Sequence, residues 1–232
     1  MRFHAVFFDA GETLVHPHPT FADLFSLVLK REGYDVGPET ITDRIHVVFD
    51  RFREAARTKE LWTTTAEKSR LFWHDVYAIF FREIGITDSD GLIDAVYREF
   101  TDVANYALFD DVVPVLGELR AAGSKLGVVS NFEGWLERLL DQLGVIGYFD
   151  VRVISGVEGL EKPDPRIFEL AMERAEVSPE RSAYVGDNPE FDIDPAAAAG
   201  MFPVLLDRRE RFPDARATRI TTLDELPAIL GL

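Results

Sequence analysis

The sequence contains no cysteine among its 232 residues. This absence excludes a disulfide framework, thiolate chemistry and a cysteine-ligated zinc site. Long apolar runs are lacking too. The first run, Ala5 to Phe8, stops at Asp9 and is far too short for a signal peptide or a membrane span, which needs ~18 apolar residues. Together these absences predict a cytoplasmic protein that does not enter a membrane.

Positive charge is scarce in this chain. The 25 Lys and Arg residues are outnumbered by 41 Asp and Glu residues, and the formal net charge is −16. A chain with this charge repels polyanions, so nucleic acid and anionic membranes are excluded as expected partners. The hydrophobic fraction of 47% is enough to bury one large domain, or a core with a smaller insert.

Short apolar runs that end in polar residues recur along the chain. They are Phe3 to Phe8 before Asp9, Leu126 to Val129 before Ser130, and Ala183 to Val185 before Gly186 and Asp187. Their length favours buried parallel strands, and helix-length amphipathic stretches lie between them. We therefore predict an α/β core with a doubly wound, Rossmann-like parallel sheet. Ligands bind at the carboxyl ends of the strands in such sheets, so the polar residues are expected to share one crevice.

Residues 15–107 show a different pattern. Phe21, Leu24, Phe25, Val28 and Leu29 follow helical spacing after Thr20, a candidate N-cap, and further stripes of this kind follow. This pattern predicts an all-helical cap domain at 15–107, inserted into a core formed by 1–14 and 108–232. Most cap aromatic residues are expected in the cap's own core. Trp62, in a predicted loop, is the candidate for contact with substrate.

Asp9 is the leading candidate for chemistry because it follows a buried strand and precedes a glycine-containing loop. A carboxylate alone repels phosphate, so a phosphate site here requires a divalent cation such as Mg²⁺. Asp187 and Asp192 can supply further carboxylate ligands. An aspartate after a strand, taken singly, is more often a turn or helix-cap residue than a catalytic one, and only the joint pattern favours a site.

Three further residues can bind an oxyanion. Lys162, in a loop before a predicted helix, can balance negative charge on a substrate. Ser130 and Asn131 follow the second strand and offer a hydroxyl, an amide and backbone N–H groups. Single lysines in loops are usually solvated and Ser-Asn is common in turns, so these residues also count only as part of the whole pattern.

Four segments resemble the ordered motifs of the haloacid dehalogenase-like hydrolase superfamily, in the group with a helical cap of the first type and a noncanonical first motif. They are residues 7–14, 128–131, 161–168 and 185–192. The resemblance implies that Asp9 attacks phosphorus to give an aspartyl-phosphate, and that Asp9 and Asp187 hold Mg²⁺ with help from Asp192. It also implies that a small phosphorylated molecule binds, through its phosphoryl group, to Ser130, Asn131 and Lys162.

Gly11 departs from the phosphatase pattern of this superfamily, which has a second aspartate there as general acid and base. The Gly11 carbonyl can still ligate Mg²⁺, but loss of a positioned acid typically costs about 10²- to 10⁴-fold in rate. Glu12, His16 and His18 are candidate replacements. A glutamate at position 12 is more typical of a solvent-facing carboxylate, and the two histidines are equally consistent with ordinary linker residues.

Three functional hypotheses remain open at this point. The first is a phosphohydrolase, best on substrates whose leaving group needs no proton. The second is cleavage of a carbon–halogen or carbon–phosphorus bond; the retained Asp187 argues against the halogen version, because haloacid dehalogenases need no Mg²⁺. The third is a catalytically weak protein that binds a phosphoryl ligand or a partner protein. The chain is expected to be a monomer or a homodimer.

Overall fold

The chain folds into two compact units. The computed structural model describes residues 2–87 and 90–232. The core unit comprises the residues up to Val15 together with Leu108–Leu232, and the inserted unit comprises His16–Ala107. Each unit is described separately below.

The core unit is built on a six-stranded sheet in the order β5-β4-β1-β6-β7-β8, in which every neighbouring pair is parallel. The strands are β1 (Ala5–Phe8), β4 (Lys125–Ser130), β5 (Val151–Ile154), β6 (Ser182–Gly186), β7 (Phe202–Leu206) and β8 (Thr218–Ile220). All four residues of β1 are buried, as expected for a strand covered on both faces. The predicted doubly wound α/β core is therefore confirmed.

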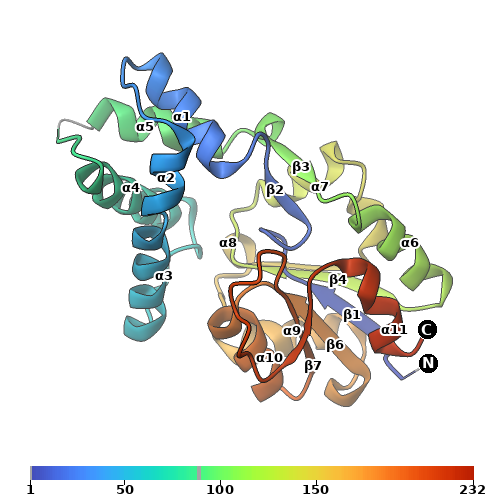
Figure 1. Ribbon diagram of the computed structural model, residues 1–232. Helices are drawn as coiled ribbons and strands as arrows, with labels where there is room; N and C mark the ends of the chain where they lie inside the picture. The colour runs from blue at the N-terminus through green and yellow to red at the C-terminus, as the bar shows by residue number, and fades with distance from the viewer. Residues whose placement is uncertain (1, 88–89) are drawn as a thin grey trace. The chain divides into compact units, whose positions relative to one another are not determined.

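Helices flank both faces of this sheet (Figure 1). They are α6 (Val112–Ala121), α7 (Leu136–Gln142), α8 (Ser155–Glu158), α9 (Pro165–Ala175), α10 (Asp194–Ala198) and α11 (Leu226–Leu230). On one face α9 and α10 pack together, and Phe168 of α9 shares a buried apolar cluster with Phe7 of β1. On the other face α6 packs against α11. Because helices pack on both faces of the sheet, the carboxyl ends of its strands, where the site lies, are held in place.

The inserted unit consists of helices around an apolar core of its own. They are α1 (Phe21–Arg31), α2 (Pro38–Arg44), α3 (His46–Thr58), α4 (Ala66–Glu83) and α5 (Asp90–Phe100). Thr20 caps α1, since its hydroxyl accepts a hydrogen bond from the backbone N–H of Asp23. In the part of the chain that the structure describes, no helix has both the length and the apolar character needed to cross a membrane.

Trp62 differs from its predicted role. Its side chain is only 6% exposed, and its ring stacks on Phe72 with centroids 4.5 Å apart. The loop position was predicted correctly, but neighbouring helices offer aromatic surface that buries the ring. Trp62 therefore belongs to the apolar core of the inserted unit.

Two short strands flank the insert where the sequence predicted none. These are β2 (Val15–Pro17) and β3 (Tyr106–Leu108), which form a two-stranded sheet. The N–H of His18 donates to Asn105 O and that of Phe109 donates to Leu14 O, so the strands run antiparallel. Strands of three residues are too short to show a recognisable alternation of apolar and polar residues, so the sequence did not predict this pair.

Candidate active site

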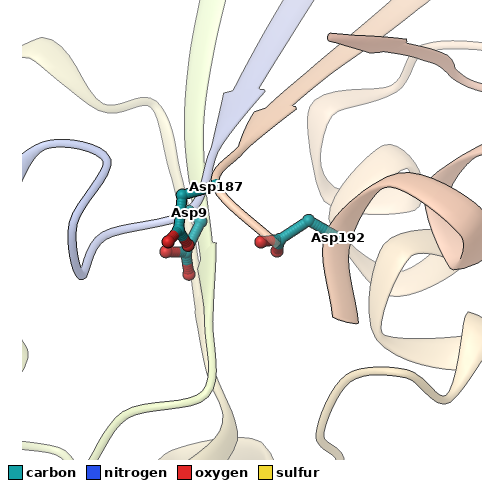
Figure 2. Close-up of side chains that lie close together, drawn as sticks. All are labelled: Asp9, Asp187 and Asp192. Atoms are coloured by element: carbon teal, nitrogen blue, oxygen red, sulfur yellow. The ribbon is translucent and has the colours of Figure 1, made fainter. Parts of the chain in front are cut away.

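The strand order brings the ends of three predicted strands together. In β1, Phe8 pairs with Val128 of β4 on one side and with Val185 of β6 on the other. Asp9 therefore lies at the same edge of the sheet as Ser130 and Asp187. Figure 2 shows the carboxylates of Asp9 and Asp187 side by side, with that of Asp192 directed toward them from the following turn.

Lys162 lies at the centre of this acidic group. Its Nζ donates to Asp9 Oδ1 at 2.7 Å and to Asp192 Oδ1 at 2.5 Å, and its side chain is 3% exposed. Burial disfavours the ammonium form, but the charges of Asp192 and Asp9 outweigh burial and raise the pKa of Lys162 to about 12. Lys162 is thus protonated at neutral pH and places a positive charge beside Asp9. Ser130 Oγ donates to the same Asp9 oxygen at 3.0 Å.

Tyr184 is a buried member of the site that the sequence did not point to. Its hydroxyl lies 3.0 Å from Lys162 Nζ, from Asp192 Oδ1 and from the carbonyl oxygen of Val129. The hydroxyl accepts from Lys162 and donates its single proton to one of the two acceptors at a time. Tyr184 stands within the buried strand β6, and a tyrosine in such a strand requires a partner for its hydroxyl. This need for a hydrogen-bond partner is the feature of the sequence from which a polar role of Tyr184 could have been inferred.

Asp187 is paired with an arginine from a distant loop. Arg211, in the loop after β7, donates from a guanidinium nitrogen to Asp187 Oδ2 at 2.8 Å. Burial, with the negative charges of Asp192 and Asp9, raises the pKa of Asp187 to about 7, although Arg211 opposes the rise. Sequence reasoning missed Arg211. Applying the strand-end rule to the apolar run Phe202–Leu206 would have pointed to this loop.

Asp9, Asp187 and Asp192 offer a donor set that suits Mg²⁺. One oxygen from each lies within 4.8 Å of the others. Mg²⁺ binds hard oxygen ligands at about 2.1 Å in an octahedron, so opposite ligands are roughly 4.2 Å apart, and one or two carboxylates with waters suffice. The oxygens therefore need only small movements to share an ion. Because cation binding also relieves repulsion among buried carboxylates, these residues fit Mg²⁺.

Asp192 is held tightly by the turn that carries it. Residues Pro189–Ile193 form a single π-helical turn, a feature frequent at functional sites. Asp192 Oδ2 accepts from the backbone N–H of Asn188 at 3.0 Å. A Cβ added at Gly186 would lie 2.4 Å from Asp192 Cγ, so glycine is required for this close approach. Asp194, by contrast, is exposed.

Asn131 holds the loop that contains Lys162. Its Nδ2 donates to Lys162 O at 2.8 Å, and its Oδ1 accepts from the Lys162 backbone N–H at 2.7 Å. This double contact fixes the backbone from which the Lys162 side chain extends. The side-chain amide that was predicted to bind phosphate is thus engaged in positioning Lys162.

The candidates for the missing acid are placed as follows. Glu12 has a left-handed backbone (φ 56°), and its carboxylate accepts from Arg209 at 2.7 Å. It is thus ion-paired to the same loop that carries Arg211. His16 and His18 belong to the inserted unit, and their roles stay predictions. At Gly11, an added Cβ would meet no atom of the described residues within 4 Å.

The chain matches known proteins over most of its length. A family model described as haloacid dehalogenase-like hydrolase matches residues 3–200. Haloacid dehalogenase-like hydrolase domain-containing protein 3 of Homo sapiens is 28% identical over 214 residues, which cover 89% of this chain and 82% of that protein. Glyceraldehyde 3-phosphate phosphatase of Methanopyrus kandleri is 37% identical over 143 residues, which cover 60% of each chain.

A solved structure shares the fold over the full length of the chain. The putative HAD-hydrolase from Bacillus subtilis, determined bound to magnesium, superposes with a TM-score of 0.81 at 19% identity and covers 100% of both chains. A likeness at this identity establishes the fold alone.

Proposed function

Because this chain belongs to the haloacid dehalogenase-like hydrolase family, we propose that it is a Mg²⁺-dependent phosphohydrolase acting on a small phosphorylated metabolite. The arrangement around Asp9 carries the proposal. One oxygen of Asp9 accepts from Ser130 and Lys162, and Asp187 lies beside it. An anionic nucleophile needs such fixed donors and cations in order to approach an anionic phosphoryl group.

The proposed reaction has two steps. A carboxylate oxygen of Asp9 attacks phosphorus, the bond from phosphorus to the leaving oxygen breaks, and an aspartyl-phosphate forms. Water then attacks phosphorus, the bond from phosphorus to the Asp9 oxygen breaks, and inorganic phosphate leaves. The two protons of that water end on the released alcohol and on phosphate. Ser130 and the protonated Lys162 bind the phosphoryl oxygens throughout.

The remaining residues of the site hold the ion and the lysine. Asp9, Asp187 and the Gly11 carbonyl would hold Mg²⁺, which when bound neutralises charge on the phosphoryl oxygens. Asp192 was predicted as a further metal ligand. Its Oδ1 accepts from Lys162 and its Oδ2 from the Asn188 N–H, so we infer that it assists chiefly by holding Lys162.

The substrate class follows from the relatives and from Gly11. Glyceraldehyde 3-phosphate phosphatase, by its name, acts on a small phosphorylated molecule, and the same class is proposed here. Glu12, the nearest carboxyl replacement for the missing acid, is engaged by Arg209. We therefore propose that aryl phosphates, whose leaving group needs no proton, react faster than alkyl phosphates.

The first experiment measures steady-state hydrolysis of an aryl phosphate with and without Mg²⁺ for the wild type and Asp9→Asn. Asn cannot attack phosphorus, so turnover should fall to background while Mg²⁺-dependent turnover persists in the wild type. The thermal midpoint of both proteins is the control for folding. Absence of Mg²⁺-dependent turnover in the wild type would favour the other bond types or a binding role.

A second variant tests the missing acid. Gly11→Asp places a carboxyl group where the added Cβ meets open space. Alkyl phosphate hydrolysis should rise by about 10² or more, and aryl phosphate hydrolysis should change much less. Gly11→Asn fills the same space without an acid and should show no gain. An equal gain in Gly11→Asn would contradict a proton-transfer explanation.

Four conclusions from the sequence stay predictions. The cytoplasmic location and the state of the chain as a monomer or homodimer rest on the sequence, as does the exclusion of nucleic acid and membrane partners. The resemblance to this family further implies that the cap domain at 15–107 acts as a lid that excludes water from the reacting centre, and this role is likewise a prediction.

A further inference from the structure

The loop that carries Arg211 is anchored by a buried carboxylate. Asp207 follows β7 and has no exposed surface. Its oxygens accept from the backbone N–H groups of Arg211 at 2.7 Å and Phe212 at 2.8 Å, and from Arg219 Nε at 2.9 Å. These bonds fix the backbone of Arg211. The direction in which its side chain leaves the loop is therefore set by Asp207.

Asp187 meets Arg211 in a partly enclosed setting. The side chain of Arg211 is 29% exposed and that of Asp187 is 18% exposed, and their charged atoms lie 2.8 Å apart. Water screens such a pair less than it screens a surface ion pair, so each charge strongly affects other ions that approach Asp187. A divalent cation at Asp187 would therefore meet a fixed positive charge at short range.

We propose that Arg211 is an exchangeable counter-ion that competes with the divalent cation for Asp187 and thereby weakens Mg²⁺ binding. The inference rests on the proposed metal site. In the metal-free protein the guanidinium neutralises Asp187 and limits repulsion among the three carboxylates. When the ion binds, Arg211 gives up part of this pairing, and the loss lowers the net affinity. Asp207 acts as a positioning residue: it holds Arg211 where its guanidinium competes with Mg²⁺ for Asp187.

The test is calorimetric titration of metal-free protein with Mg²⁺ in the absence of substrate at about pH 9, where the Asp187 carboxyl, whose pKa is about 7, is ionised and protons do not compete with the metal. Arg211→Gln removes the competing charge and should bind Mg²⁺ roughly tenfold more tightly than the wild type. Arg211→Lys keeps the charge and should stay within about threefold of the wild type. Arg216→Gln removes the same charge from the same loop without touching the Arg211–Asp187 pair, and should change the affinity less than about twofold.

Asp207→Asn tests the anchor. It should shift Mg²⁺ affinity in the same direction as Arg211→Gln, by a smaller factor, while Asp207→Asn combined with Arg211→Gln should give no further gain. Thermal midpoints of all variants show whether each one folds. A residue that only supported the fold would weaken Mg²⁺ binding when removed, which is the opposite sign.

The outcomes separate this inference from the proposed function. Wild-type protein that binds no Mg²⁺ would overturn both. Wild-type protein that binds Mg²⁺, with equal or weaker binding by Arg211→Gln, would overturn the counter-ion role of Arg211 and leave the proposed phosphohydrolase standing.

Discussion

Gly186 and Gly11, two glycines of the motifs, differ in the space available for an added methyl group. At Gly186 a Cβ would lie 2.4 Å from Cγ and 2.6 Å from Oδ2 of Asp192, which is far inside van der Waals contact. At Gly11 a Cβ would meet nothing within 4 Å in the part of the chain that the structure describes. The difference follows from their neighbours, because only Gly186 lies against the turn that returns Asp192 to the site.

The first stability prediction uses this contrast. Gly186→Ala should lower the free energy of unfolding by about 1–3 kcal/mol, because Asp192 or the strand must move to relieve the overlap. Gly11→Ala, the matched control, should change it by less than about 1 kcal/mol. Urea denaturation followed by circular dichroism measures both. Equal stability of Gly186→Ala and wild type would show that the overlap is relieved at no cost.

The residues that could be predicted from the sequence share one property. Asp9, Ser130 and Asp187 follow recognisable buried strands, and parallel strands end at one edge of a sheet. Arg211 lies in the loop after β7, to which the strand-end rule points, but the hydrogen bond to the buried Asp207 that holds its backbone is not revealed by any pattern in the sequence. Tyr184 lies within a strand and contributes its hydroxyl to the site. An aromatic residue in a buried strand is ordinarily interpreted as a core residue, so this role was not predicted.

At the scale of elements, one ion pair joins three parts of the core unit. Asp111, at the start of α6, accepts two hydrogen bonds from Arg208 of the β7–β8 loop, at 2.7 and 2.8 Å. It also accepts from the Leu223 N–H and the Thr222 hydroxyl, both at 2.8 Å. Burial opposes ionisation, but these bonds outweigh it and hold the pKa of Asp111 below its usual value.

A pH dependence follows from this pKa shift. The folded state holds the Asp111 proton less tightly than the unfolded state, whose aspartates titrate near pH 3.9. The stabilisation is therefore complete above about pH 4 and is lost as the pH falls through the lower, folded-state pKa. Asp111→Asn should cost about 3 kcal/mol at neutral pH, because Arg208 loses its charged partner, and should flatten the decline of stability in acid.

Urea denaturation of Asp111→Asn between pH 3 and 7 measures both effects. The control is Glu54→Gln, which breaks the exposed pair with Arg57 on α3 and should cost less than about 0.5 kcal/mol. If the free energy of unfolding of Asp111→Asn falls as steeply in acid as that of the wild type, the acid sensitivity comes from other carboxylates.

Secondary structure was predictable where an element is long enough to show its period. The helices α1 and α9 repeat apolar residues over several turns, and their caps, Thr20 and Asp164, are the residues that cap helices in general. The strands β2 and β3 have three residues each and are defined by each other, across the whole insert. The two strands lie far apart in the sequence, so an analysis of local hydrophobic periodicity cannot detect that they pair.

At the scale of the whole molecule, each of the two units contains a buried apolar cluster of its own. One buried cluster draws all its members from the inserted unit, from Leu24 to Phe100, and another draws all its members from the core unit, including Phe7 and Phe168. The chain leaves and re-enters the core unit through the antiparallel β2–β3 pair. Since the two strands lie side by side, a tight turn can connect them directly.

The prediction is that the core unit folds and binds metal without the insert. Replacing residues 18–105 by Asn-Gly should preserve cooperative unfolding, because the sheet and the apolar cluster that covers it are retained. Mg²⁺ affinity should stay within about threefold of the wild type, since the carboxylates, Lys162 and Arg211 all belong to the core unit. Hydrolysis of an aryl phosphate should fall at least about tenfold if the insert excludes water and orients the substrate as predicted.

The same shortened protein distinguishes two ways in which this expectation can fail. Loss of cooperative unfolding, seen by calorimetry, would mean that the core unit depends on the insert for stability. Cooperative unfolding with Mg²⁺ binding and an unchanged kcat/KM would mean that the core unit alone carries out the reaction, and the predicted lid function of residues 15–107 would be wrong. Activity that falls while metal binding is kept would assign the chemistry to the core unit and substrate positioning to the insert.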